Sequence, residues 1–502
     1  MTGSVPRVVV AAPASGTGKT TVAVGLMGAL RQAGHTVAGF KVGPDYIDPG
    51  FHAVATGRPG RNLDPMLSGE ERVGPLFAHG AADADIAVIE GVMGLYDGAL
   101  GTDGYASTAH VAKLLKAPVV LVVDASAAGR SVGAVVQGFV AYDPEIRIVG
   151  VILNKLGSDR HEAEVRAGVA PTGIPVLGTL RRDPRLTVPS RHLGLIPATE
   201  QQTQAEQAVT AATELVRQGV DLTTFTTAAK AAPPQAFTPW NPTTEVTHPR
   251  ATAATPASGH PATPIPPTAG HPATGILPTS GHRATATTPT SGHPAPPLTS
   301  VQGHQPLIAV AAGPVFSFHY TETTELLRAA GAEVVTFDPL TDKLPEATAG
   351  LYLGGGFPEL HAEALSANKD LHTQVSSKIT SGMPTVAECA GLLYLCRELD
   401  GHKLTGVLPA TAHMTGKLTL GYRTAVAATT TTFYDEGRRV RGHEFHRTAI
   451  EPDDGVSPAW HLPGGVEGIA RPHVHASYLH LHWTATPDVP ARFVAAAREF
   501  ES

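Results

Sequence analysis

Cys389 has the sequence surroundings of a catalytic thiol, because it lies between a strand-type run and a helix-type run in PTVAECAGLLYLCREL. Ala390 and Gly391, which follow it, are small enough to let the backbone bend sharply from strand to helix. A cysteine on such a turn is presented for attack, and the start of the helix favours its thiolate. We predict that Cys389 is a nucleophile and that Cys396 is a small buried side chain.

A thiol nucleophile also needs oxyanion donors and a general base. The strand-like stretch GLYLGGGFPEL ends in three glycines, and we assign the backbone N–H groups of Gly355 and Gly356 as donors. A base is expected in the tail HVHASYLHLHW, where His480 and His482 would share one face of a strand. Zinc binding is the competing interpretation, but no cysteine or carboxylate accompanies these histidines at metal spacing.

A second chemical site is indicated by VVVAAPASGTGKTTVAVGLMGAL, in which an apolar strand, a loop of small residues and a helix follow in order. Such a loop turns backbone N–H groups toward phosphates, while a lysine reaches the outer phosphates and a hydroxyl ligates Mg²⁺. Pro13 stands where the usual pattern has glycine, so the loop is a variant. Ala14 stands where partitioning ATPases have lysine, which favours a metabolic enzyme. The residues assigned to nucleotide binding are Gly16, Thr17, Gly18, Lys19 and Thr20.

Carboxylates after the second and third strands could complete an Mg²⁺ site beside Thr20, because these strand ends meet at one edge of a parallel sheet. FKVGPDYIDP follows the second strand, and EGVMGLYDG ends the third. We predict that Thr20, Asp45 and Glu90 hold the metal, so the expected cofactors are ATP and Mg²⁺. Asn154, in GVILNKLG, is a weaker candidate for contacting the nucleotide base.

Six apolar runs of strand length between residues 5 and 225 must position the phosphate loop and these acids. They span residues 5–12, 35–42, 84–91, 118–126, 146–155 and 174–180, and helix-type segments separate most of them. This alternation is typical of a parallel sheet covered on both faces. We predict a first α/β domain over residues 1–225.

A second α/β pattern must position Cys389. Its strand-type runs span residues 306–313, 332–339, 349–356 and 384–389, and each is followed by a turn or helical stretch. The tail from about residue 404 to 485 is richer in Gly, Thr and His and is expected to be partly antiparallel. We predict a separate α/β domain over residues 305–502.

Between the domains, residues 226–304 are dominated by Pro, Thr, Ala and Gly, with an 11-residue repeat that begins GHPATPIPPTA. This composition has too few large apolar residues to form a core. The equally spaced repeat histidines suggest metal binding, but Pro and Gly favour an extended, mobile chain. We predict a disordered linker.

The overall composition favours small-molecule partners. The chain has 502 residues, 42% of them hydrophobic, and a net charge of -7, so no basic stripe indicates nucleic acid or an anionic membrane. No apolar run approaches the roughly 18 residues that span a bilayer, and the N-terminus does not resemble a signal peptide. We expect a cytoplasmic protein with two reduced thiols.

Seven motifs occur in an order that is itself informative. They are APASGTGKTT, KVGPDYIDP, EGVMGLYDG, GGGFPE, AECAGLLYL, GHEFH and SYLHLHW. Together they resemble the cobyrinic and hydrogenobyrinic acid a,c-diamide synthases, a family of glutamine-dependent amidating enzymes of corrin biosynthesis. The resemblance implies a P-loop amidoligase related to dethiobiotin synthetase, joined to a class I, triad-type glutaminase. ATP and Mg²⁺ would convert an acetate carboxylate to an acyl phosphate, and ammonia from glutamine would displace the phosphate. The c acetate of the macrocycle would be amidated first and the a acetate second.

The resemblance also implies roles for residues at matching positions. It assigns Cys389 as the nucleophile and His480, within the tyrosine-leucine-histidine element, as the base. Many related glutaminases have Glu two residues beyond that histidine, where this chain has His482, so the third triad member is open. The resemblance agrees with the phosphate and metal assignments above. It also implies that Tyr46, Asp48 and Asp97 contact the substrate.

Several alternatives stay open at this stage. The macrocycle could be hydrogenobyrinic or cobyrinic acid, or the same chemistry could act on another tetrapyrrole or on other corrin carboxylates. From a different class, the chain could be a regulatory nucleotide switch with an inert glutaminase-like domain, an alternative opposed by Ala14 and by the intact Cys389 and His480. The expected partners are glutamine and a corrin, and a homodimer is open. For His443 and His446 we have no mechanism and prefer a structural or substrate-contacting role.

Overall fold

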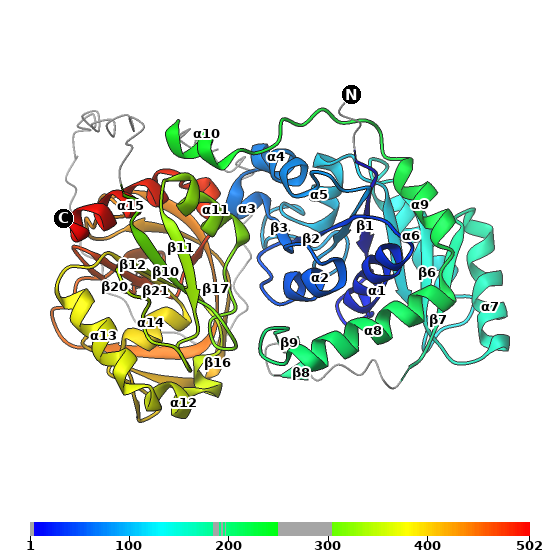
Figure 1. Cartoon of the computed structure of the whole chain (residues 1–502). Coiled ribbons are helices and arrows are strands. Elements are labelled where there is room, and N and C mark those ends of the chain that lie inside the picture. The colour runs from blue at the N-terminus through cyan, green and yellow to red at the C-terminus, as the bar shows by residue number, and fades with distance from the viewer. Residues whose placement is uncertain (1–4, 184–189, 192–193, 196, 249–303) are drawn as a thin grey trace, which may run out of the picture. The chain divides into compact units, whose positions relative to one another are not determined.

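The structure is a computed structural model, and it describes residues 5–183, 190–191, 194–195, 197–248 and 304–502. These residues form two α/β domains, each with a sheet that is parallel at its centre (Figure 1). The second domain also contains an antiparallel sheet. This arrangement confirms the predicted fold class.

The first domain is built on a parallel sheet in the order β3-β2-β4-β1-β5-β6-β7. In β1, Val8 and Val10 pack into one apolar cluster while Val9 and Ala11 pack into another, because alternate side chains point to opposite faces. Burial on both faces explains the continuous apolar runs of the sequence. The strands are β1 (Arg7–Ala11), β2 (Val37–Val42), β3 (Arg61–Leu63), β4 (Ile86–Glu90), β5 (Val119–Asp124), β6 (Ile148–Leu156) and β7 (Val176–Arg181), with a separate pair, β8 (Ser190–Arg191) and β9 (Gly194–Leu195).

Helices cover both faces of this sheet. The cluster with Val8 and Val10 also holds side chains of α1, α2 and α8, and α1 and α8 lie side by side (Figure 1). The cluster with Val9 and Ala11 holds side chains of α4, α5, α6 and α7. The helices are α1 (Lys19–Gln32), α2 (Asp48–Thr56), α3 (Pro65–Ser68), α4 (Glu70–Gly80), α5 (Thr108–Leu114), α6 (Val132–Tyr142), α7 (Asp159–Val169), η1 (Ala170–Thr172), α8 (Gln202–Gly219), α9 (Leu222–Lys230) and α10 (Pro242–Thr247).

Residues 226–248, predicted as part of the disordered linker, are ordered in the structure. Trp240 is only 3% exposed, and its backbone N–H donates to the carbonyl of Pro75 in α4 over 2.9 Å. Phe237 packs against Gly74, and Asn241 caps α10 through its side chain. A few large apolar residues therefore anchor a polar stretch that composition alone marks as unfolded. The rest of the predicted linker, residues 249–303 with nearly all of the repeat, lies outside the described residues.

We expect Trp240→Ala to destabilise the first domain by roughly 3 to 5 kcal/mol, because a large buried ring would leave a cavity against α4. Differential scanning calorimetry should show a lower thermal midpoint. Leu100→Ala is the control, since Leu100 is 101% exposed and its loss should leave the midpoint unchanged. Equal midpoints for both variants would contradict the packing of this segment on α4.

The central sheet of the second domain has the order β11-β10-β12-β13-β21-β20. Neighbouring strands in this order are parallel, except that β20 pairs with β21 antiparallel. The first four follow the predicted strand runs. The strands are β10 (Leu307–Ala311), β11 (Glu333–Phe337), β12 (Thr348–Leu353), β13 (Thr385–Glu388), β20 (Ile469–Arg471) and β21 (Val474–Ser477). Its helices are α11 (Thr321–Ala329), η3 (Pro358–Leu360), α12 (Ala362–Ala367), α13 (Lys369–Thr380), α14 (Ala390–Leu395), η4 (Trp483–Ala485) and α15 (Asp488–Glu501).

The tail of the chain forms the predicted antiparallel structure. A long hairpin of β16 and β17 pairs through β17 with β22, which brings His443 opposite His480. The antiparallel sheet thereby brings together two histidines that lie far apart in the chain. The strands are β14 (Glu398–Leu399), β15 (His402–Lys403), β16 (Ala410–Ala427), β17 (Arg439–Pro452), β18 (Trp460–Leu462), β19 (Gly465–Glu467) and β22 (His480–Leu481).

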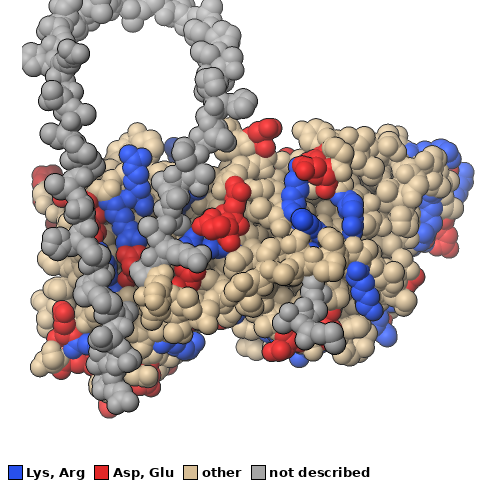
Figure 2. Space-filling model, turned by 90° about the horizontal axis from the view of Figure 1, so that it is seen from above, with Lys and Arg blue, Asp and Glu red and all other residues tan. Residues whose placement is uncertain are grey.

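The surface and the helix lengths add two observations. On the face drawn in Figure 2, Lys and Arg side chains lie among Asp and Glu side chains. Within the described part of the chain, no helix combines the length and apolar character needed to cross a membrane.

Candidate functional site

The loop between β1 and α1 has the backbone that its glycines predict. Gly16 and Gly18 have φ values of 79° and 87°, in the left-handed region that glycine adopts without strain. A Cβ on Gly18 would lie 2.4 Å from Nδ2 of Asn154. That amide donates to the backbone carbonyl of Thr17 over 2.9 Å. Asn154 therefore holds the phosphate loop, and its contact with the nucleotide base stays a prediction.

Lys19 and Thr20 begin α1, directly after the loop. Nζ of Lys19 donates to the carbonyl of Met93 over 2.6 Å, and two of its three N–H donors stay available for phosphate oxygens. Burial, helped by the nearby Lys41 ammonium, lowers the pKa of Lys19 to about 8. The hydroxyl of Thr20 donates to Oε1 of Glu90 over 2.5 Å. The phosphate loop is thus connected directly to the end of β4.

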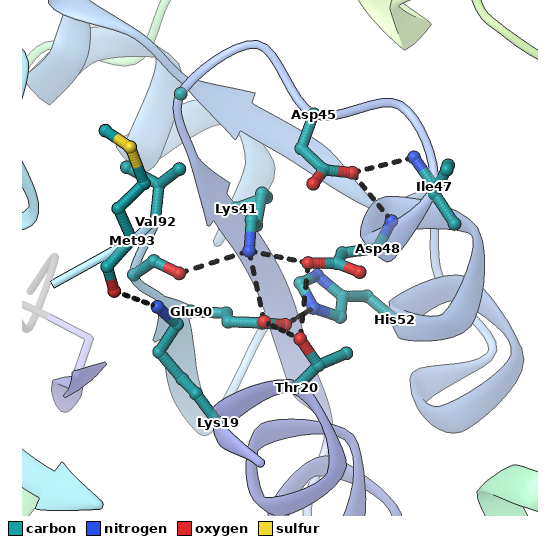
Figure 3. A network of polar contacts seen from close by, with 12 residues as sticks. Lys19, Thr20, Lys41, Asp45, Ile47, Asp48, His52, Glu90, Val92 and Met93 are labelled. Atoms are coloured by element: carbon teal, nitrogen blue, oxygen red, sulfur yellow. Dashed lines mark hydrogen bonds and ion pairs between the residues drawn. The ribbon is translucent and has the colours of Figure 1, made fainter. Parts of the chain in front are cut away.

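Thr20, Lys41, Asp48 and Glu90 form a buried group that we call the carboxylate cluster (Figure 3). Nζ of Lys41 lies 2.6 Å from Oδ2 of Asp48 and 3.1 Å from Oε1 of Glu90. The sheet explains the arrangement, because β2 and β4 are parallel neighbours with Lys41 opposite Glu90, and α2 begins at Asp48. Side chains from four elements, α1, β2, α2 and β4, therefore meet at one edge of the sheet.

The charges in the cluster depend on one another. Burial would lower the pKa of Lys41, but the carboxylates of Asp48 and Glu90 outweigh it and raise that pKa. Burial would raise the pKa of Glu90, but Lys41 and His52, whose Nε2 is 2.7 Å from Oε2, lower it. Burial and the neighbouring carboxylates raise the pKa of Asp48. Lys41 and Glu90 are therefore charged, and the cluster has more acids than bases.

The donor set of the cluster fits Mg²⁺, which prefers oxygen ligands. Oγ1 of Thr20 lies 2.5 Å from Glu90 and 3.4 Å from Asp48, so a hydroxyl and two carboxylates converge. The Lys41 ammonium already lies among these oxygens, which shows that they accommodate a positive charge. Asp48, predicted to contact substrate, therefore belongs with Thr20 and Glu90 in the candidate metal site.

Asp45, predicted as a metal ligand, has a different position. Its Oδ1 accepts hydrogen bonds from the backbone N–H groups of Ile47 and Asp48, at 2.8 and 3.0 Å, so it fixes the start of α2. Its charge still raises the pKa of Asp48. Asp97 is exposed, and its Oδ2 accepts from the N–H of Gly94 over 2.9 Å. Asp45 therefore borders the cluster without joining it, and Asp97 lies in the loop that follows β4.

Cys389 lies on the sharp turn that its neighbours predict. Its φ and ψ are 48° and -97°, a strained conformation for a residue with a side chain, between β13 and α14. The backbone is held there by a 2.7 Å hydrogen bond from the N–H of Cys389 to the carbonyl of Ser477. A Cβ on Gly391 would lie 2.4 Å from the carbonyl of Leu353, so the turn requires glycine at that position. Cys396 is a buried free thiol, as predicted.

The backbone groups facing Cys389 differ in part from the prediction. Burial raises the pKa of the Cys389 thiol to about 12, and the N–H groups of Gly356 and Ala390 oppose this rise through hydrogen bonds. The N–H of Gly355 instead donates to the carbonyl of Phe318 over 3.0 Å, because these residues form a short antiparallel bridge. Gly356 and Ala390, rather than Gly355, are therefore placed to stabilise negative charge at this turn.

His480 is completely buried in β22 beside the glycine turn. A Cβ on Gly355 would lie 2.2 Å from Cε1 of His480, so the absence of a side chain at Gly355 makes room for the imidazole. Burial, and then the nearby His443 and His446, lowers the pKa of His480 to about 3. Neither ring nitrogen has a hydrogen-bond partner among the residues that the structure describes. The imidazole is therefore neutral, and its ring nitrogens are not engaged by the residues that the structure describes.

His482, two residues after His480, does not supply the carboxylate that a third triad member would provide. Nδ1 of His482 pairs with the hydroxyl of Thr484 over 2.8 Å, and Nε2 lies 3.8 Å from Oε2 of Glu322. Glu388, directly before the cysteine, accepts from the N–H of Leu481 over 3.4 Å. It therefore braces the strand that carries His480. Burial raises the pKa of Glu388 to about 8.

Three residues of these sites were not predicted from the sequence. Lys41 is a charged residue inside an apolar strand run, and such a residue is rarely buried without partners, so this signal was available. Ala390 follows the nucleophile on a strand-to-helix turn, where a backbone donor is expected. His52 had no distinguishing signal, because its contact with Glu90 depends on the packing of α2.

Comparison with protein families identifies the two domains. The CobQ/CobB/MinD/ParA nucleotide binding domain matches residues 8–196, and the CobB/CobQ-like glutamine amidotransferase domain matches residues 307–488. The phosphate loop and the cysteine turn lie within these respective matches. The protein is thus a glutamine amidotransferase with an attached nucleotide-binding domain.

Whole-chain relatives define the family more narrowly. Hydrogenobyrinate a,c-diamide synthase of Streptomyces coelicolor is 53% identical, over 99% of this chain and 98% of its own. The enzyme of the same name from Thermobifida fusca is 50% identical, over 98% and 96% of the two chains. Cobyrinate a,c-diamide synthase of Gloeobacter violaceus is 39% identical, over 97% and 96%. The chain belongs to this a,c-diamide synthase family of corrin biosynthesis, and it is an enzyme that forms C–N bonds.

Proposed function

We propose that this enzyme uses ATP, Mg²⁺ and glutamine to amidate the a and c acetate carboxylates of hydrogenobyrinic acid. The two relatives at 50% identity or above are named for that reaction. The observation that carries the proposal is the combination, in one chain, of the strained Cys389 turn with a phosphate loop leading into the carboxylate cluster. One site can release ammonia and the other can activate a carboxylate to receive it.

In the first domain, the loop N–H groups and Lys19 bind the phosphates of ATP, whose outer phosphoryl group turns the macrocycle carboxylate into an acyl phosphate. Mg²⁺, held by Thr20, Asp48 and Glu90, would neutralise phosphate charge. Lys41 contacts both carboxylates, and it keeps Glu90 charged by lowering the pKa of that side chain. The candidate contacts to the macrocycle are Asp45 and Tyr46, in the segment that leads to Asp48, and Asp97, in the loop after β4.

In the second domain, Sγ of Cys389 attacks the carboxamide carbon of glutamine and gives its proton to His480. Gly356 and Ala390 donate N–H groups to the oxyanion. The high pKa of the thiol and the low pKa of the imidazole mean that both groups start neutral, so the proton moves as the C–S bond forms. His480 then gives this proton to the amide nitrogen as the C–N bond breaks, so that the nitrogen leaves as ammonia, and water hydrolyses the resulting thioester to glutamate.

Gly355→Ala should lower glutamine-driven amidation by roughly 10²-fold, because the added methyl would displace the His480 ring. Amidation driven by a high concentration of ammonium should stay near the wild-type rate, since ammonia does not need His480. Product amide measured with each nitrogen source checks this. Gly416→Ala is the control, because a Cβ there meets nothing within 4 Å. Undiminished glutamine use by the Gly355 variant would count against the placement of His480.

Cobyrinic acid is the second candidate substrate, because the Gloeobacter relative is named for it. Incubation of the enzyme with ATP, Mg²⁺, glutamine and each macrocycle in turn, followed by mass spectrometry, decides between them. We expect the diamide of the cobalt-free macrocycle to form faster. Faster conversion of the cobalt-containing macrocycle would reverse the assignment, and conversion of neither would contradict the proposed function.

A further inference from the structure

The imidazole of His480 lacks the polar partner that usually orients a catalytic base. Both ring nitrogens are without hydrogen bonds among the described residues, although the ring is completely buried. The position that could supply a carboxylate is His482, which pairs with Thr484 and faces Glu322. Glu388 reaches the backbone of Leu481 and not the ring. Something other than a hydrogen bond must therefore set the direction of this imidazole.

Tyr46 supplies a ring contact to His480 from the other domain. The centroids of the two rings lie 4.9 Å apart with their planes inclined by 35°. The close approach of Gly355 to Cε1 limits the imidazole as well. Since a buried aromatic contact of this kind restricts both translation and tilt, Tyr46 and Gly355 together define the position of the ring.

Tyr46 is itself held firmly by residues of the second domain. Its hydroxyl is 2.7 Å from the hydroxyl of Tyr320, and the two rings lie 4.9 Å apart. Its ring also stacks on Phe318 at 5.2 Å with an interplanar angle of 18°. Phe318 is the residue whose carbonyl accepts the N–H of Gly355. Tyr46 is therefore integrated into the aromatic wall behind the glycine turn.

The segment that carries Tyr46 also leads into the carboxylate cluster. Asp48, two residues later, contacts Lys41 at 2.6 Å, and Asp45, one residue earlier, caps α2. The backbone of this short segment is thus fixed by the first domain while its tyrosine ring contacts the second. Its position depends on the residues that would hold Mg²⁺ and the carboxylate substrate.

We propose that Tyr46 is a positioning residue of the glutaminase, supplied by the nucleotide-binding domain, and that its ring sets the direction of the His480 imidazole toward Cys389. This inference depends on the proposed role of His480 as the base. It gives Tyr46 a function in ammonia release in addition to any contact with the macrocycle. It also makes glutamine hydrolysis dependent on the seating of the segment that leads into the ligase site.

The test compares glutamine-driven with ammonium-driven amidation in the full-length enzyme, using Tyr46→Leu, Tyr46→Met and Tyr46→Phe. For the Leu and Met variants, we expect the ratio of the two rates to fall roughly tenfold, with kcat for glutamine reduced and KM for glutamine little changed. Tyr46→Phe keeps the ring and should restore most of the ratio. Met fills a similar volume and provides a second probe if the Leu variant is poorly folded.

Two further variants make the outcomes distinguishable. Tyr142→Leu, at an exposed tyrosine of the same domain, should leave the ratio unchanged. His480→Ala should lose glutamine-driven amidation and keep the ammonium-driven reaction. An unchanged ratio in the Leu and Met variants, including equal losses with both nitrogen sources, would overturn the positioning role while His480→Ala still supports the proposed function. Undiminished glutamine use by His480→Ala would overturn both.

Discussion

Cys389→Ala is expected to lower glutamine-driven amidation by roughly 10³-fold or more, while amidation with high ammonium stays near the wild-type rate. The thiol is the only group proposed to bond covalently to glutamine, and its role ends when ammonia leaves. Ammonia from solution can reach the acyl phosphate without it. The substitution keeps a side chain of similar size at the strained φ of 48°, so the turn should persist.

The matched control for this prediction is Cys396→Ala, which removes the second buried thiol of the same helix region. Its Sγ contacts the carbonyl of Leu392 over 3.3 Å, a structural contact with no part in the proposed chemistry. We expect near-normal rates with both nitrogen sources. Glutamine-driven synthesis by Cys389→Ala would refute the nucleophile assignment. Loss with both sources in a folded variant would mean that Cys389 also supports the ligase site.

Glu90→Gln should show the opposite pattern, with amidation lowered roughly 10²-fold or more from either nitrogen source and glutamine hydrolysis still detectable. The amide would bring no charge to the cluster, which would weaken the hold on Mg²⁺ and release Lys41 and His52 from their shared carboxylate. Product amide and released glutamate, measured in the same reaction, separate the two activities. Raising the Mg²⁺ concentration should restore part of the rate.

Asp85→Asn is the control for Glu90→Gln, because Asp85 precedes the opposite end of β4. It is exposed, and its carboxylate accepts only from the N–H of Thr36 in the described contacts, over 2.7 Å. We expect its variant to behave as the wild type. Equal loss of amidation and glutamine hydrolysis in Glu90→Gln would indicate that Glu90 has a structural role, and no loss would remove it from the metal site.

The sheet of the first domain and its phosphate loop were predictable because both have local signals. Apolar runs such as VVLVVD form strands, and the loop glycines at 16 and 18 have the positive φ that their spacing requires. The sequence did not show which of Asp45 and Asp48 points into the carboxylate cluster, because the two acids lie three residues apart on either side of the start of α2. Which of them points into the cluster depends on the residue at which the helix begins, and sequence patterns locate that boundary only approximately.

In the second domain, too, local features were predictable from the sequence and contacts between distant segments were not. The turn at Cys389 was predictable from its small neighbours, but the pairing of Gly355 with Phe318 joins segments that no local pattern connects. That pairing uses the N–H of Gly355 and leaves Gly356 and Ala390 at the thiol. The order of the segment around Trp240 was missed for a similar reason, because the residue that Trp240 contacts lies in α4, far away in the chain. Contacts between distant segments are what composition and periodicity cannot supply.

The most direct test of the account follows nitrogen from glutamine to the macrocycle. Wild-type enzyme is incubated with hydrogenobyrinic acid, ATP, Mg²⁺ and glutamine labelled with ¹⁵N in the side-chain amide, with unlabelled ammonium at a low competing concentration. We predict that mass spectrometry will find ¹⁵N in both new amides of the product, at a and at c, and that the label will be absent when Cys389→Ala is supplied with ammonium at high concentration. Unlabelled amides from the wild-type enzyme would contradict the central claim that ammonia released at Cys389 reaches the activated carboxylates.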